Sequence, residues 1–113
     1  IVLDIGNERK TKMEITNRQG TYYEETEIMN IFEANENGQL IGEMYLDINT
    51  GQIMQIEVNE DRRGEGIARA IYEYACSITD VYHAPDEHCT REGLAFKNAV
   101  GGEEIDPETA YQP

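Results

Sequence analysis

The feature that most constrains the fold is a change of hydrophobic period at a short basic turn that contains two glycines. Residues 54–58 alternate apolar and polar side chains, which is typical of a half-buried strand. From Ile67 onward, apolar residues recur every three or four positions, as they do along one face of an amphipathic helix. Residues 62–66 (RRGEG), which we name the glycine turn, lie between the two patterns. The sequence therefore predicts a strand that leads through this turn into a helix over about residues 64–77.

The glycine turn is suited to binding an anion. The first backbone N–H groups of a helix have no partner inside the helix and lie at the positive end of its dipole, so a phosphate there accepts several hydrogen bonds. Gly64 and Gly66 lack a Cβ atom, which lets a bulky pyrophosphate approach the backbone. Arg62 and Arg63 add positive charge. The alternative is that the turn is only the solvated first turn of a surface helix.

The rest of the chain predicts a meander of antiparallel strands before the turn and two helices in all. The expected strands comprise residues 11–17, 27–34, 40–48, 52–58 and 78–84. Asn37-Gly38 is a hairpin signal, and residues 18–20 are expected to form a turn. A second helix is expected over residues 90–100 with Thr90 as its cap, before a loose tail. The sum is a single α/β or α+β domain over residues 1–113, with a mostly antiparallel mixed sheet.

The charge distribution separates one basic island from an acidic chain. The formal net charge of -14 argues against direct binding to nucleic-acid phosphates and favours a cationic partner or substrate. Three of the nine Lys and Arg residues fall between positions 62 and 69, and none lies between positions 19 and 61. An anionic ligand is therefore expected at the glycine turn.

Apolar runs and cysteine spacing point to a cytoplasmic protein without membrane contact. No run approaches the roughly 20 apolar residues of a membrane span, and no leader pattern opens the sequence. Cys76 and Cys89 form no C-x-x-C pair, so we expect both to be reduced, with Cys76 in the helix core. The polar residues from His83 to Cys89 match no zinc spacing, so no metal site is expected.

The glycine turn and its flanks resemble a known family. Residues 63–68 (RGEGIA) are similar to the R-x-x-G-x-G/A signature of the GNAT superfamily of N-acetyltransferases, in its short phage and bacterial form. Residues 38–58 look like the third and fourth strands of small GNAT proteins. The resemblance covers about residues 25–102. It implies a minimal GNAT-like fold with an acyl-CoA-binding core over that range.

For the cofactor, the resemblance implies acetyl-CoA or another acyl-CoA. Its pyrophosphate would lie on the backbone of the glycine turn and the start of the helix. Its pantetheine arm would pair like an extra strand with residues 56–58, where this strand diverges from residues 78–84. The expected cofactor-binding residues are Ile56, Val58, Arg62, Arg63, Gly64, Glu65, Gly66, Ile67 and Ala68.

The acceptor half of the family's site is mostly absent. Residues 18–26 are too few for the usual acceptor-side helices, and the closing helix has Phe96-Lys97 where a tyrosine often protonates the leaving thiolate. The acceptor site is therefore expected to be open or completed by a partner subunit, and an uncovered sheet face leaves a homodimer as one arrangement. Tyr22 and Tyr23 are candidates to line its entrance.

Two residues are candidates for catalysis. Glu57 is the candidate base, on the strand face that also carries Glu43 and Asp47, where carboxylates would attract a cationic acceptor. The alternative is that these carboxylates are simply solvated. His83 is a candidate base or proton relay, and the alternative for it is a hydrogen-bonded histidine without a catalytic role.

Two main functions remain open at this stage. The first is an N-acetyltransferase that transfers an acetyl group from acetyl-CoA to a basic amine, such as a protein lysine or a small polyamine-like compound. The second is a catalytically inactive acidic binding protein of the same fold, phage-encoded, that inhibits a host protein. A CoA-sensing regulator is a third. The intact turn favours the first, whereas the missing acceptor helices and tyrosine favour the second.

Overall fold

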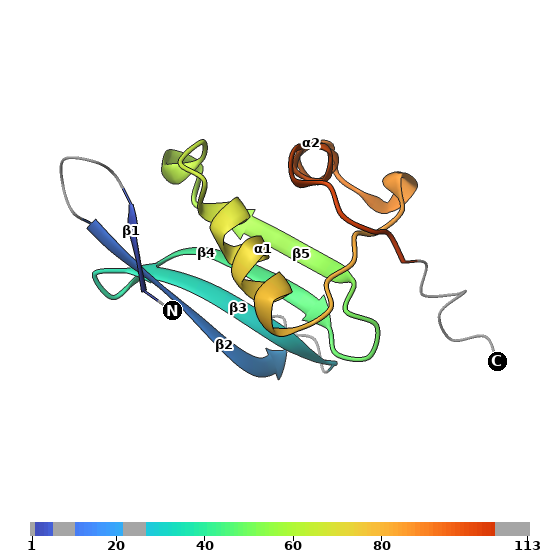
Figure 1. The fold of residues 1–113 in the computed structure, drawn as a ribbon, viewed down its shortest axis with the longest axis horizontal. Helices are drawn as coiled ribbons and strands as arrows, with labels where there is room; N and C mark the ends of the chain where they lie inside the picture. The colour runs from blue at the N-terminus through green and yellow to red at the C-terminus, as the bar shows by residue number, and fades with distance from the viewer. Residues whose placement is uncertain (1, 6–10, 22–26, 106–113) are drawn as a thin grey trace.

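The computed structural model describes residues 2–5, 11–21 and 27–105, and it has an α+β fold in which a twisted antiparallel sheet carries two helices (Figure 1). The strands are β1 (Val2–Ile5), β2 (Thr11–Thr21), β3 (Ile28–Glu36), β4 (Gln39–Asp47) and β5 (Ile53–Val58). The helices are α1 (Ile67–Ile78) and α2 (Arg91–Val100), preceded by the short 3-10 turns Glu60–Arg62 and Asp86–His88. The predicted α+β class and mostly antiparallel sheet are confirmed.

The strands follow one another across the sheet in chain order, so that neighbours in sequence are neighbours in space. The order is β1-β2-β3-β4-β5, and each of these pairs is antiparallel. Asn37 and Gly38 join β3 to β4 with φ angles of 52° and 79°, as a tight hairpin with the right twist requires. The predicted hairpin is thus confirmed, and β5 occupies one edge of the sheet (Figure 1).

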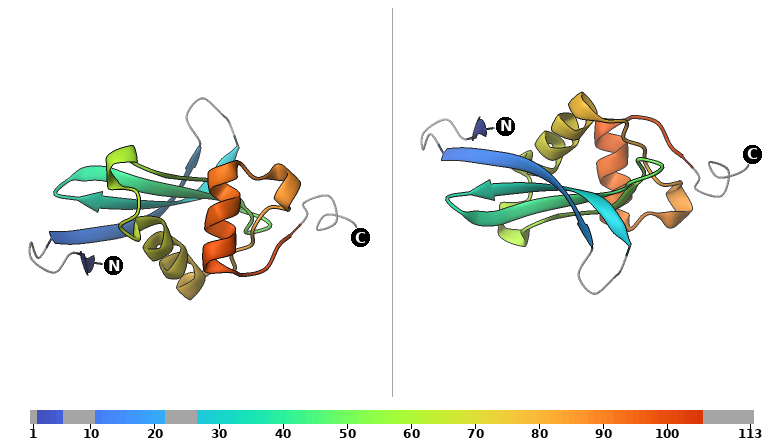
Figure 2. Two further views of the ribbon diagram at one scale, coloured as in Figure 1. Left: turned by 90° about the horizontal axis from the view of Figure 1, so that it is seen from above. Right: turned by 90° about the horizontal axis from the view of Figure 1, so that it is seen from below.

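Helix α1 packs its apolar stripe across β3, β4 and β5. Ile67, Ile71 and Ala75 are buried at four-residue spacing, so they lie on one face of the helix. Gly42 on β4 admits this face closely, because a Cβ atom there would lie 3.0 Å from a methyl of Ile67 and 3.2 Å from one of Ile71. Figure 2 shows α2 beside α1 in both views. The two helices therefore share one core, whose other buried members include Met13, Ile15, Phe32, Ala34, Met44 and Leu46.

Two glycine signals were misread in the sequence. The predicted turn at residues 18–20 is wrong, because these residues continue β2. The side chain of Arg18 lies over Gly20, but its guanidinium is the end of a flexible, exposed side chain, so the contact does not require glycine. The first helix begins at Ile67 rather than at residue 64, because Gly64 and Gly66 both have φ of 83°, in the left-handed region.

Two further predictions about the α1 region are wrong. No strand spans residues 78–84, because α1 continues to Ile78 and only Tyr82 and His83 then form isolated parallel bridges. Cys76 is exposed rather than in the core, because Ala75 takes the buried position and each helical residue turns by about 100°. Helix α2 matches its prediction, and Thr90 Oγ1 accepts the N–H of Gly93 as its cap. Tyr22, Tyr23 and the tail from residue 106 lie outside the described residues.

Replacement of Ile71 by alanine should lower the free energy of unfolding by about 2–5 kcal/mol, because a fully buried side chain leaves a cavity between α1 and the sheet. Ile78→Ala is the matched control, since Ile78 is on the same helix but 51% exposed. It should cost less than about 1 kcal/mol. Urea titration of both variants measures the difference. Equal losses would show that the stripe does not hold α1 on the sheet.

Candidate functional site

The glycine turn presents open backbone at the start of α1. Around Gly64 and Gly66, no atom of the described residues beyond their chain neighbours comes within 4 Å of the place where a Cβ atom would lie. Within the same part of the chain, no side chain caps α1 at Gly66. The N–H groups of its first turn therefore face outward at the positive end of the helix dipole. This arrangement is able to bind an anion.

The edge of β5 lies next to the glycine turn and also presents open backbone. Asn59 N donates to Ile41 O across to β4, and Glu57 is opposite Glu43, so the backbone groups of these alternate residues point toward β4. The N–H and C=O groups of Ile56 and Val58 consequently point away from β4. Arg63 Nε donates to Val58 O at 3.3 Å from that side. Arg63 thus connects the glycine turn to the free edge.

The chain that returns from α1 touches β5 only at its first residues. Ile53 N donates to Tyr82 O at 2.8 Å, and Tyr82 N donates to Gly51 O at 2.9 Å. After His83 the chain turns away through Pro85 into the second 3-10 turn. Within the described residues, β5 therefore has no strand partner on this side from its middle to Val58. This is where the sequence predicts a divergence of two strands, although only one bridge is formed at its base.

The remaining residues of the expected cofactor set take different positions. Ile67, the first residue of α1, is buried against the sheet and anchors the first turn, whereas Ala68 is half-buried. Ile56 and Val58 pack their side chains against the core. Arg63 is exposed, whereas Arg62 makes a bidentate ion pair with Glu36 and a second one with Glu65. Arg62 and Glu65 are thus engaged with each other, a pairing that the sequence reasoning missed.

The predicted catalytic residues lie on different sides of β5. Gly42, next to Glu43 on β4, faces α1, so Glu43 and its partner Glu57 face away from the helices. His83 instead packs against Tyr72 of α1 and Phe96 of α2, with ring centroids 5.4 and 6.3 Å away. The structure does not bring Glu57 and His83 together.

The predicted negative surface around Glu57 is smaller than expected. Glu43 is buried and accepts a hydrogen bond from Tyr45 Oη at 3.1 Å. Asp47 accepts the N–H groups of Asn49 and Thr50 at 2.8 Å, in the turn between β4 and β5. Glu57 is exposed and accepts a hydrogen bond from the side chain of Gln55. Glu57 is therefore the one exposed carboxylate of this trio.

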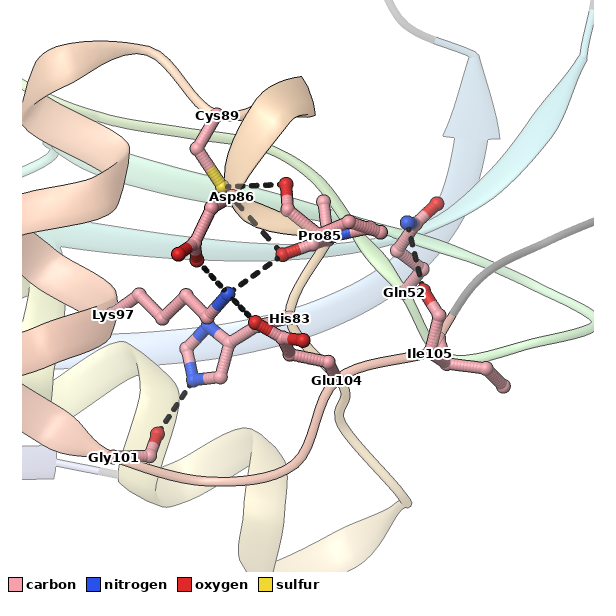
Figure 3. A network of polar contacts seen from close by, with 10 residues as sticks. Gln52, His83, Pro85, Asp86, Cys89, Lys97, Gly101, Glu104 and Ile105 are labelled. Carbon is pink, nitrogen blue, oxygen red and sulfur yellow. Dashed lines mark hydrogen bonds and ion pairs between the residues drawn. The ribbon is translucent and has the colours of Figure 1, made fainter.

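His83 is a buried, hydrogen-bonded histidine. Its side chain is among the least accessible polar groups, 3% exposed, and Nε2 lies 2.6 Å from Gly101 O (Figure 3). Burial lowers the pKa of His83 below its ordinary value of 6.5, and the nearby Lys97 ammonium lowers it further, while the bond to Gly101 acts in the opposite direction. The neutral ring therefore donates its Nε2 proton to the carbonyl. This geometry matches the alternative given above, a histidine without a catalytic role.

Lys97 anchors α2 through charge, in addition to the apolar packing of Phe96 and Val100, and no local sequence pattern indicates this role. It is the one buried side chain of α2, and Nζ donates to Ala84 O at 3.2 Å, to Asp86 and to Glu104 (Figure 3). The last two partners come from the segments before and after the helix. Gln52 Nε2 also donates to Ile105 O at 3.2 Å. Polar contacts therefore fasten the closing part of the chain to the sheet.

A hollow of about 390 Å³ lies at the opposite end of α1 from the glycine turn. Its lining includes Asp47, Thr50, Thr79, Asp80 and Tyr82, so its walls are largely polar and acidic. An anion would be repelled by these carboxylates. The hollow and the anion-binding turn are therefore separate features.

Comparison of the chain with models of known protein families, with curated proteins and with solved structures returned no match. The candidate site therefore stands on its own residues. Among the residues that the structure describes, no helix has the length and apolar character needed to cross a membrane.

The buried His83 predicts a pH dependence of stability. Because its pKa is lower in the folded state, the unfolded chain takes up the proton first as the pH falls below 6.5. The free energy of unfolding should therefore decrease as the pH is lowered through this range, and His83→Gln should remove that decrease. His88→Gln, which replaces an exposed histidine, is the control and should follow the unmodified protein. Urea titrations between about pH 7.5 and pH 5 test this. The prediction would be contradicted if the free energy of unfolding of the His83 variant fell with pH as steeply as that of the unmodified protein.

Proposed function

We propose that the protein binds acetyl-CoA or another acyl-CoA and acts as a GNAT-like N-acetyltransferase on a basic amine. The observation that carries the proposal is the combination of an uncapped helix start behind two left-handed glycines with the open backbone edge of β5. The two features are joined by the bond from Arg63 to Val58 O. One supplies donors for a pyrophosphate, and the other supplies a place for an extended polar chain.

The glycine turn fits the pyrophosphate. The N–H groups that follow Gly66 would donate to phosphate oxygens, and the space around Gly64 and Gly66 leaves room for a bulky group. Arg63 is exposed, and its described hydrogen bond uses only Nε, so its terminal nitrogens would face the ligand. This arginine supports binding of an anion in a chain of strong negative charge.

The β5 edge fits the amide-containing pantetheine arm. Ile56 and Val58 would offer backbone donors and acceptors to its two amides, while their side chains stay in the core. Ile53 N is already bonded to Tyr82 O, so the open part of the edge runs from Ile56 to Val58 and spans about 7 Å at the usual strand rise. That length allows the edge to pair with part of an extended pantetheine arm.

Turnover requires more than binding. The thioester supplies the acetyl group, and the chain must remove a proton from the amine, polarise the carbonyl and let the thiolate be protonated. Backbone N–H groups of β5 could polarise the carbonyl. Glu57 is the exposed carboxylate near this edge, and it would act as the base for an amine that approaches from the side opposite the helices. A cationic acceptor suits the acidic chain.

A second candidate function is a catalytically inactive acidic binding protein. The placement of His83 and Glu57 on different sides of β5 favours it, since the two candidate catalytic groups do not converge beside the edge. Release of free CoA thiol from acetyl-CoA in the presence of a polyamine separates the two. The acetyltransferase predicts release that Glu57→Gln reduces at least about tenfold, whereas the binding protein predicts CoA binding with no release.

Acetyl-CoA binding by the unmodified protein is the main test, measured by isothermal titration calorimetry. Gly66→Val should weaken binding at least about tenfold, because the side chain would fill the space at the helix start and change its backbone. Gly38→Val is a matched control, since Gly38 has φ of 79°, similarly open surroundings and a place in the distant hairpin. It should lose stability but bind normally. No binding by the unmodified protein, or equal binding by both variants, would refute the proposal.

A further inference from the structure

Arg62 and Glu65 form the centre of a charge cluster beside the glycine turn. The Arg62 guanidinium donates to Glu65 through Nε at 2.9 Å and Nη2 at 3.0 Å. It also donates to Glu36, at the end of β3, through Nη1 at 3.0 Å and Nη2 at 2.8 Å. A guanidinium has five N–H donors, so these contacts leave one. Because its side chain is also only 22% exposed, Arg62 is poorly placed to bind a ligand itself.

Glu65 poses an electrostatic problem for an anion site. It lies between Gly64 and Gly66, in the backbone segment where the N–H groups would meet a phosphate. A carboxylate and a phosphate a few ångströms apart repel each other, even in a solvated environment. The overall negative charge of the chain adds to this repulsion. The turn therefore needs a local positive charge that compensates Glu65.

We infer that Arg62 is a positioning residue that holds and neutralises the Glu65 carboxylate, so that the glycine turn accepts an anion while Arg63 faces it. The inference rests on the proposed binding of acyl-CoA and specifies how this chain achieves it. Glu36 fixes the other side of the guanidinium to β3, which keeps Arg62 from turning toward the ligand. The two adjacent arginines thus have different tasks.

The interaction between two substitutions distinguishes charge compensation from a simple structural brace. If Arg62 only braces the turn, removal of Glu65 breaks the same brace and weakens binding as well. If Arg62 compensates Glu65, removal of Glu65 leaves binding intact and also rescues the loss of Arg62. If Arg62 is itself a phosphate ligand, removal of Glu65 does not rescue its loss. The three roles therefore predict three different double-mutant cycles.

The experiment uses the full chain with Arg62→Gln, Glu65→Gln and the double substitution, titrated with CoA and separately with inorganic pyrophosphate. Arg62→Gln should weaken binding about tenfold, from the uncompensated carboxylate. Glu65→Gln should bind as tightly as the unmodified protein or more tightly. The Kd of the double variant should lie within about threefold of that of the unmodified protein. Arg18→Gln is the matched control, because it removes the same charge and also breaks an ion pair. Arg18 lies on β2 and pairs with Glu33 of β3, away from the glycine turn. It should bind normally.

Other results would overturn the inference. Equal weakening by Arg62→Gln and Glu65→Gln shows a brace, failure of the double variant to recover shows a direct ligand, and normal binding by Arg62→Gln shows no role. If Arg62→Gln does not fold by circular dichroism, Arg62→Lys replaces it. Lysine keeps the charge but cannot bond two carboxylates at once as a guanidinium does. The affinity of Arg62→Lys should therefore lie between those of the unmodified protein and Arg62→Gln, and adding Glu65→Gln should raise it. Pyrophosphate binding with the expected pattern but without CoA binding would refute only the acyl-CoA proposal, whereas no binding of either would overturn both.

Discussion

The packing of α1 on the sheet is the contact on which the candidate site depends. Ile67 and Ile71 lie so close to Gly42 that a Cβ atom there would make tighter contacts than usual with both side chains. Because Ile67 is also the first residue of α1, the buried contact fixes where the helix begins relative to the end of β5. The glycine turn has to cover this fixed gap, and it does so with two left-handed glycines. The exposed backbone of the glycine turn is thus held by apolar contacts beneath it.

The local parts of this arrangement could be predicted from the sequence, and the non-local parts could not. Each of three features, the period change, the Asn37-Gly38 hairpin and the Thr90 cap, is encoded by residues that lie close together in the sequence. The pairing of Arg62 with Glu36 depends on strand register and on residues far apart in the chain, so no local pattern indicates it. Gly20 looks like a turn residue in its local sequence, yet it continues β2 because of the pairing of β2 with β3.

Binding and turnover rest on unequal support. The glycine turn and the β5 edge are joined by the bond from Arg63 to Val58 O, and backbone groups of both lack a strand or helix partner within the described residues, which the proposed cofactor would use. Glu57 and His83 face different sides of the sheet, and His83 is held between aromatic rings. The helix that would close the site is fastened by Lys97 and its carboxylate partners, which is a structural arrangement. The proposal of cofactor binding therefore has more structural features behind it than the proposal of turnover.

The internal pairing of cations has a consequence for association rates. Arg18, Arg62 and Lys97 are bound to carboxylates, so part of the positive charge is neutralised within the molecule while other carboxylates face solvent. A polyanion approaching such a surface is slowed by long-range repulsion, which salt screens over about 10 Å at 0.1 M. Its encounter with the glycine turn should therefore become faster as ionic strength rises, the reverse of the usual behaviour for a charged ligand and an oppositely charged cleft.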